Sequence, residues 1–246
     1  MLGFQISASR SAVAGEPQST ITARSCAGLG NSLTKNDIEL RGARLGFALD
    51  ANTMGRAFQN FATDSLRLIE NTEPFYSPVR EAVTLNSSQG VQRNVVPDAV
   101  TSVLIVEFNS QGAITYSAPY NKSYFNEMKF SRGDIYLSSF EHQIIGYVDI
   151  ASTSPAGVAP TSLGTRRPTP AVEFVTNSDA VIALNVITKF TQERVAVYQR
   201  IACDAPSTPS TTDMVVGARV PLNPEVYQNN FPVSFRPSGI VAGLRR

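Results

Sequence analysis

Hydrophobic and polar residues alternate along most of the chain with the two-residue period of β-strands, and Gly, Pro, Asn and Ser interrupt the alternation at short intervals. This pattern predicts strands at Gln18–Ser25, Ile38–Leu49, Val79–Leu85, Val100–Phe108, Ala113–Ala118, Ile135–Phe140, Ile144–Ile150, Val172–Thr176, Ala180–Phe190 and Arg194–Ala202. Short polar stretches at 109–112 and 191–193 predict that two pairs of these strands form hairpins. The pattern therefore predicts an all-β fold.

One segment has a helical period instead. Apolar or small residues recur there at the three- and four-residue spacing of one helix face: Phe58, Phe61, Ala62, Ser65, Leu66 and Ile69. We expect one amphipathic helix of about four turns at about 53–71. The stripe carries no pair of inward charges, so this helix is predicted to cap the end of a β core.

Proline-rich stretches without periodicity divide the chain into a body and two arms. The predicted organisation is an N-terminal arm at 1–17, a single β-rich domain at 18–219 and a C-terminal arm at 220–246. Long loops are expected at 151–170 and 204–212, because neither stretch can build a core. The apolar arms must lie on something, either their own domain or a neighbouring subunit.

The charge balance limits the kinds of partner that this chain is expected to bind. Lys and Arg total 21 against 20 Asp and Glu, which leaves a net charge of +1. Proteins that bind nucleic acid through its phosphates collect basic residues on one surface, so strong nucleic-acid binding through a basic arm is not expected. No apolar stretch is long enough to span a bilayer, which predicts no membrane insertion, and the first ten residues lack the features of a signal peptide.

Residues that could support catalysis or metal binding are few. Cys26 and Cys203 are isolated, so two buried thiols are expected, with a disulfide as the alternative. His142, the single histidine, is expected in a solvated turn, and no Gly-x-Ser-x-Gly elbow accompanies it. We therefore predict no enzyme, no cofactor and no metal. A hydrolase that uses two carboxylates stays open, because the scattered acids give no spacing from which to choose a pair.

One tripeptide has a recognition association. The sequence Arg132-Gly133-Asp134 is associated with adhesion to integrin-type receptors when an exposed loop tip displays it. It lies between two predicted apolar runs, so it could form a hairpin tip. Gly-Asp is also an ordinary turn pair, so the structural interpretation competes with that of a receptor loop.

Arginine outnumbers lysine by 17 to 4, and arginine is enriched at protein interfaces while lysine is depleted there. A GC-rich genome would produce the same bias. With the β-rich pattern, the single helix, the long Ser/Thr/Pro loops and the apolar arms, the whole chain resembles jelly-roll coat proteins and related virion structural proteins. The resemblance implies an all-β, jelly-roll-like sandwich or barrel.

The same resemblance implies a self-assembling capsid subunit, made in the host cytoplasm and located in the virion, whose partners are its own copies and other virion proteins. The arm residues expected at interfaces are Val226, Tyr227, Phe231, Phe235, Ile240 and Arg245. A phage tail, neck or cement component is one alternative, because residues 1–17 lack the basic cluster of many coat-protein arms. A β-sandwich module that binds a receptor or glycan is the other.

Overall fold

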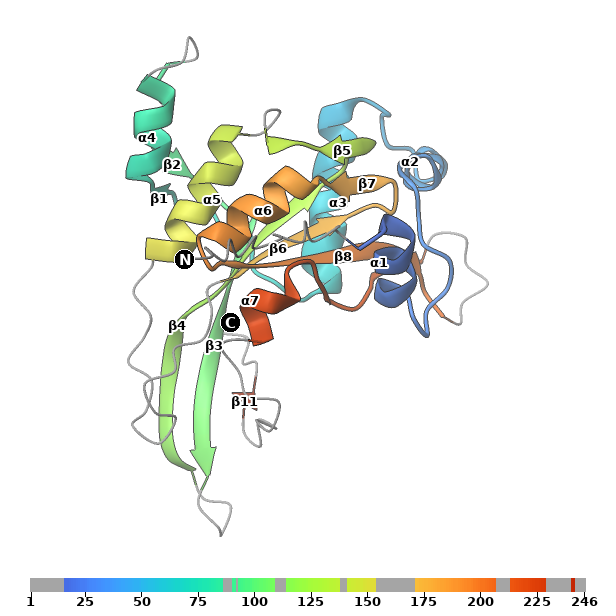
Figure 1. Cartoon of the computed structure of the whole chain (residues 1–246). Helices are drawn as coiled ribbons and strands as arrows, with labels where there is room; N and C mark the ends of the chain where they lie inside the picture. The colour runs from blue at the N-terminus through green and yellow to red at the C-terminus, as the bar shows by residue number, and fades with distance from the viewer. Residues whose placement is uncertain are drawn as a thin grey trace, which may run out of the picture.

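The structure is a computed structural model that describes residues 16–85, 90–91, 93–108, 114–137, 141–153, 171–206, 213–228 and 240–241. Its fold is mixed α/β, with helices packed on a mixed sheet, so the prediction of an all-β jelly roll is wrong (Figure 1). The capsid and jelly-roll identification depended on that architecture and is withdrawn with it.

The elements follow one another in this order: α1 Gln18–Ser25, α2 Lys35–Arg44, α3 Ala51–Ser65, β1 Phe75–Tyr76, α4 Pro78–Leu85, β2 Asn94–Val95, β3 Ala99–Phe108, β4 Ile114–Lys129, β5 Gly133–Ile135, α5 Glu141–Thr153, β6 Ala171–Thr176, β7 Ala180–Ile182, α6 Leu184–Gln192, β8 Ala196–Asp204, β9 Met214–Val216, β10 Val220–Pro221, α7 Pro224–Gln228 and β11 Ile240–Val241. None of the described helices is long and apolar enough to cross a membrane.

The main sheet has the order β10-β8-β6-β4-β3-β11, with β9 also paired to β8. Strands β4, β6 and β8 are parallel, and β3 runs antiparallel to β4. The connections between the parallel strands carry α5 and α6, as parallel pairing requires. Two small sheets, β1-β2 and β5-β7, lie beside the main sheet.

Two hydrophobic cores cover the two faces of the sheet. The first joins α5 and α6 to β6 and β8 and includes Tyr147, Phe174 and Phe190. The second joins α2 and α3 to Met128 and Val175 of the opposite face. Both faces of the parallel strands are therefore buried, which is why β6 is buried along its whole length.

Four of the predicted strands are wholly or mainly helical. They are Gln18–Ser25 (α1), Ile38–Leu49 (mostly α2), Val79–Leu85 (α4) and Ile144–Ile150 (within α5). Helix α5 is buried on all sides from Ile144 to Ile150, so its sequence has no polar stripe to reveal the helical period. Helices α2 and α4 carry start signals that the alternation concealed, namely a Thr34/Asp37 capping box and Pro78 at the first position.

A fifth predicted strand, Ala180–Phe190, is a short strand followed by a helix. Val186 and Phe190 are buried on one face of α6, and β8 then begins at Ala196. The predicted hairpin through 191–193 is therefore the turn from a helix into a strand. His142 lies in α5, within its first turn, and not in the expected solvated turn.

Other predictions are confirmed. The helix predicted at 53–71 is confirmed in part as α3, which spans Ala51–Ser65, so Leu66 and Ile69 of the predicted stripe lie beyond its end. Asp50 caps α3 by accepting the N–H groups of Asn52 at 3.1 Å and Thr53 at 2.9 Å. Strands β3, β6 and β8 lie where strands were expected, and β3 and β4 form the predicted hairpin.

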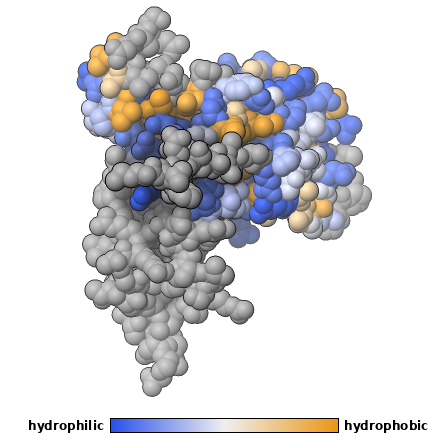
Figure 2. Space-filling model, in the orientation of Figure 1, coloured by the Kyte–Doolittle hydropathy of each residue, from blue (hydrophilic) through white to orange (hydrophobic). Residues whose placement is uncertain are grey.

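Figure 1 shows the outer part of the β3–β4 hairpin extending away from the helices. Apolar residues also reach the surface over α4, at the upper left of Figure 2, where Val79 and Leu85 are exposed.

Near the ends, the chain is fastened to its own domain. Cys26, at the end of α1, forms a disulfide with Cys203 of β8, in place of the two thiols expected. Ser25 accepts the N–H of Ile201 at 2.9 Å and donates to the carbonyl of Ala218 at 2.8 Å. At the C-terminal side, β10 pairs with β8, and β11 pairs with β3.

Candidate functional site

The most unusual site in the described residues is a cluster of ionisable side chains between β4 and α5. Glu127 and Lys129 point from alternate positions of β4 toward α5, which contributes Gln143 and Tyr147, while Asp98 lies just before β3. Because β3 and β4 are antiparallel with Ala99 opposite Asn126, the hairpin brings Asp98 beside Glu127. The fold therefore joins two carboxyl groups that are far apart in the sequence.

Glu127 is nearly inaccessible and accepts three hydrogen bonds. The donors are Gln143 Nε2 at 2.8 Å, Lys129 Nζ at 2.6 Å and the Tyr147 hydroxyl. Such a set of donors stabilises the ionised form of a carboxyl group. These contacts fix the Glu127 side chain between β4 and α5.

Asp98 has a different environment. Its carboxyl group hydrogen-bonds to that of Glu127 and accepts the N–H of Met128 at 2.6 Å. Burial and the neighbouring Glu127 raise the pKa of Asp98 to about 7. Burial and Glu127 also raise the pKa of Tyr147 well above its ordinary value. The Tyr147 hydroxyl therefore stays protonated and donates a hydrogen bond to Glu127. Asp98 is therefore the carboxyl group of this cluster that exchanges a proton near neutral pH.

A second buried carboxylate lies on the next strand. Glu173 of β6 contacts Arg200 Nε at 3.0 Å with one oxygen and Arg219 Nε with the other. Arg200 also donates to the carbonyl of Gly217 at 2.9 Å, and Arg219 stacks over Tyr198. Two arginines thus bind the two oxygens of one buried carboxyl group.

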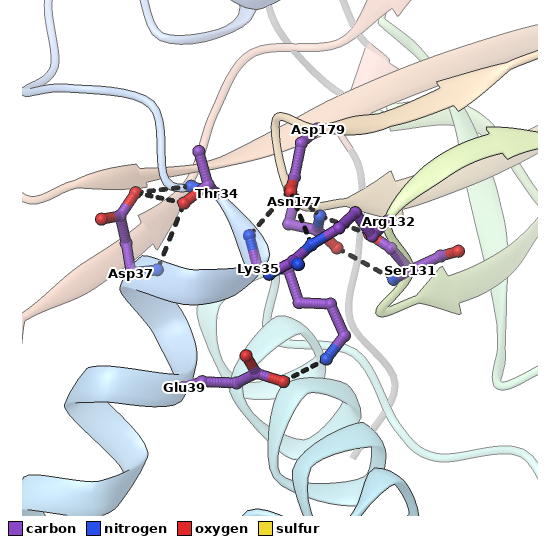
Figure 3. Close-up of polar contacts among 8 residues, drawn as sticks. All are labelled: Thr34, Lys35, Asp37, Glu39, Ser131, Arg132, Asn177 and Asp179. Carbon is purple, nitrogen blue, oxygen red and sulfur yellow. Dashed lines mark hydrogen bonds and ion pairs between the residues drawn. The ribbon is translucent and has the colours of Figure 1, made fainter.

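A third polar cluster lies where the parallel strands β4 and β6 end (Figure 3). Asp179 accepts the backbone N–H of Lys35 at 2.7 Å, and Asn177 bonds to Ser131 in both directions, at 3.1 Å and 2.6 Å. Ligands of open α/β sheets commonly bind outside the carboxyl ends of the strands. Here the groups bond to one another, so the cluster fastens α2 to the sheet.

The tripeptide Arg132-Gly133-Asp134 lies beside this third cluster. Gly133 and Asp134 belong to β5, which pairs with β7, so the tripeptide does not form the expected hairpin tip. Arg132 is 65% exposed and lies 3.8 Å from Asp179, while Asp134 accepts a hydrogen bond from Tyr136. Whether it binds a receptor stays a prediction.

The residues predicted at interfaces fall in and beyond the last helix. Val226 is buried in α7 against its own domain, and Ile240 belongs to β11. Tyr227 is in α7, but its side chain lies outside the described part, as do Phe231, Phe235 and Arg245.

Within the described residues, no three His, Cys, Asp or Glu side chains are arranged to hold a metal ion. The chemistry available in the Asp98–Glu127 cluster is the binding and release of a proton. Sequence reasoning missed this pair, because the predicted second strand ended at Ala118 and two register shifts between β3 and β4 determine which residue lies beside Asp98.

Comparisons of the chain with family models, with curated proteins and with solved structures found no match.

Proposed function

We propose that this chain is a non-catalytic structural subunit that associates with a second copy of itself through the β3–β4 hairpin. The observation that carries the proposal is the length of the hairpin. Strand β6 pairs with β4 only over Tyr124–Lys129, so Ile114–Ser123 extends beyond it. Among the described strands, this outer part of β4 pairs only with β3, and β3 pairs in turn with the short β11.

The sequence of the outer hairpin supports a contact role. Val103 to Val106 are four consecutive apolar residues of β3, a pattern typical of a strand that is covered on both faces. A two-stranded ribbon is marginally stable on its own in water. Pairing or packing with a second hairpin would stabilise such a ribbon.

Charge favours a second copy as the partner. The only charged residues between positions 101 and 124 are Glu107, toward the tip, and Lys122, toward the base. Two hairpins packed around a two-fold axis in opposite directions would bring Glu107 of each near Lys122 of the other. The net charge of +1 opposes such association very little.

The disulfide supports a setting outside the reducing cytosol. Disulfides persist in oxidising compartments and are rare in cytosolic proteins. The Cys26–Cys203 bond closes a loop across 177 residues of sequence separation and lies in the core. We therefore propose that the protein works in an oxidising compartment.

The test is the mass of the purified chain in sedimentation, followed by charge reversal. We expect a dimer, and we expect Glu107→Lys or Lys122→Glu to weaken it about two- to fivefold, because single exposed ion pairs contribute about 0.2–1 kcal/mol. The doubly reversed variant should recover the wild-type affinity. Asp64→Lys, on α3, is the matched control and should change nothing. A monomer up to about 100 µM, or a double variant weaker than both single variants, would overturn the proposal.

A further inference from the structure

The Asp98–Glu127 pair lies at the base of an excursion from the sheet. This α4 excursion, defined as residues 70–98, contains β1, α4 and β2 and packs against α5. Its two ends meet at Asp98, because Asn71 donates its backbone N–H to the Asp98 carbonyl at 2.9 Å and its side-chain amide to the Pro97 carbonyl at 3.0 Å. Any change at Asp98 therefore acts on both ends of the excursion.

The side-chain carboxyl group of Asp98 adds a contact between the excursion and the sheet. Asp98 bonds to the Met128 N–H and to Glu127 of β4. The Tyr147 hydroxyl, which donates to Glu127, also lies 3.4 Å from the carbonyl of Val96. One hydrogen-bonded group thus joins the excursion, β4 and α5.

A count of charges shows why the proton matters. Lys129 and Glu127 come from β4, Tyr147 from α5 and Arg80 from α4, where its charge acts on Tyr147. Glu70 follows α3 and forms a β-bridge with Ala99 beside the pair. Asp149 of α5 is a further acid at this contact, because it accepts the N–H of Val79 in α4 at 3.4 Å. When Asp98 loses its proton, its carboxylate adds a negative charge directly beside Glu127, and like charges at neighbouring positions repel.

We propose that the Asp98–Glu127 pair is a proton-operated latch, in which one shared proton holds the α4 excursion on β4 and α5 and its loss loosens the excursion. The mechanism transfers only a proton, from the pair to water, and breaks the carboxyl–carboxyl hydrogen bond. It does not depend on the proposed dimer, because the outer part of the hairpin, between residues 101 and 124, takes no part in it.

The test is amide hydrogen exchange on the wild-type chain, with protection factors corrected for the intrinsic effect of pH. Between pH 6 and 8, we expect the protection of the α4 amides, such as that of Glu81, to fall about tenfold, as a one-proton equilibrium near pH 7 requires. Amides of β6 and β8 should keep their protection. The Met128 amide, which donates to Asp98, should show a chemical-shift titration with its midpoint near pH 7.

The matched variant is Asp98→Asn, which keeps a donor for Glu127 and an acceptor for Met128 but cannot titrate. We expect it to hold the α4 protection constant from pH 6 to 8, while the control Asp64→Asn behaves like the wild type. A Met128 titration without loss of α4 protection would show that the pair does not act on the excursion. Absence of the titration between pH 5 and 9 would overturn the shared proton itself. Either result would overturn the proposed latch. Both are measured on the wild-type chain, so they do not require the variant to fold.

Discussion

Two glutamates on neighbouring parallel strands, Glu127 of β4 and Glu173 of β6, have the same burial and opposite surroundings. Their side chains are 3% and 2% exposed. Glu173 lies between two arginines, whereas Glu127 faces one lysine and a second carboxyl group, that of Asp98. They also point to opposite faces of the sheet, because Glu127 faces α5 whereas Glu173 alternates with Phe174 of the α5 and α6 core.

The difference shows that burial alone does not determine what a carboxylate does. Glu173 is paired with two arginines, so it forms a fixed structural ion pair. Glu127 lies beside Asp98, whose pKa is raised to about 7, so this site responds to pH. The sign of the neighbouring charges separates the two roles.

The largest effect is expected when Glu173 is removed. Glu173→Ala leaves Arg200 and Arg219 without their carboxylate in a largely buried site. Breaking one partner of a buried ion pair lowers the free energy of unfolding by about 3–5 kcal/mol. Urea denaturation at pH 6 and pH 8 measures it, and the loss should be equal at both values.

Glu173→Gln is the matched control, because it keeps the shape and removes only the charge. Its loss should be smaller than that of the alanine variant. A loss from Glu173→Ala that depends strongly on pH between 6 and 8 would mean that Glu173 also titrates, and the contrast between the two sites would fail.

A smaller effect with a different pH signature is expected at Glu127. The raised pKa of Asp98 means that the folded state binds more protons than the unfolded state, so wild-type stability falls as the pH rises toward and through about 7. Glu127→Gln removes the like charge and should lower the pKa of Asp98. Stability at pH 6 should drop by about 1–3 kcal/mol, because Tyr147 and Lys129 lose an ionised acceptor.

Measured from pH 6 to 8, the Glu127→Gln variant should lose the pH dependence that the wild type has. Denaturation curves over this range test the expectation. If the variant and the wild type decline in parallel, a group other than the pair controls the pH dependence.

The sequence identified the strands β3, β6 and β8 of the main sheet but not most of the helices, and α5 shows one physical reason. Strands β3, β6 and β8 and helix α3 were predicted because each shows a clear period or an apolar run between polar turns. Helix α5 was missed because Ile144–Ile150 has no polar face in the folded chain. An element enclosed on all sides carries no periodic signal, so only its packing reveals it.

The contact between Asp98 and Glu127 was not predicted for a related reason. The hairpin was predicted, but its second strand was expected to end at Ala118, whereas β4 continues to Lys129. With the shorter strand, nothing placed Glu127 beside Asp98. The irregular register of β3 and β4 between Thr101 and Val103 further obscures the pairing. The sequence shows that Asp98 and Glu127 are acidic, but whether they lie side by side depends on how far β4 extends.

The smallest effect, and the most specific, is expected from Tyr147→Phe. Tyr147 is fully buried and donates its hydroxyl to Glu127, so the variant keeps the ring and removes one donor from an ionised acceptor. The cost should be about 0.5–1.5 kcal/mol. Glu127 is then less stabilised as an anion, so the pair holds its proton more tightly and the Met128 titration moves to higher pH.

The control variant is Tyr76→Phe. Tyr76 is exposed and donates to Glu81 at 2.7 Å, so the loss of its hydroxyl should change the free energy of unfolding by no more than about 0.5 kcal/mol. Equal losses from the two variants, or a titration that moves to lower pH, would show that the Tyr147 hydroxyl does not support the charge on Glu127.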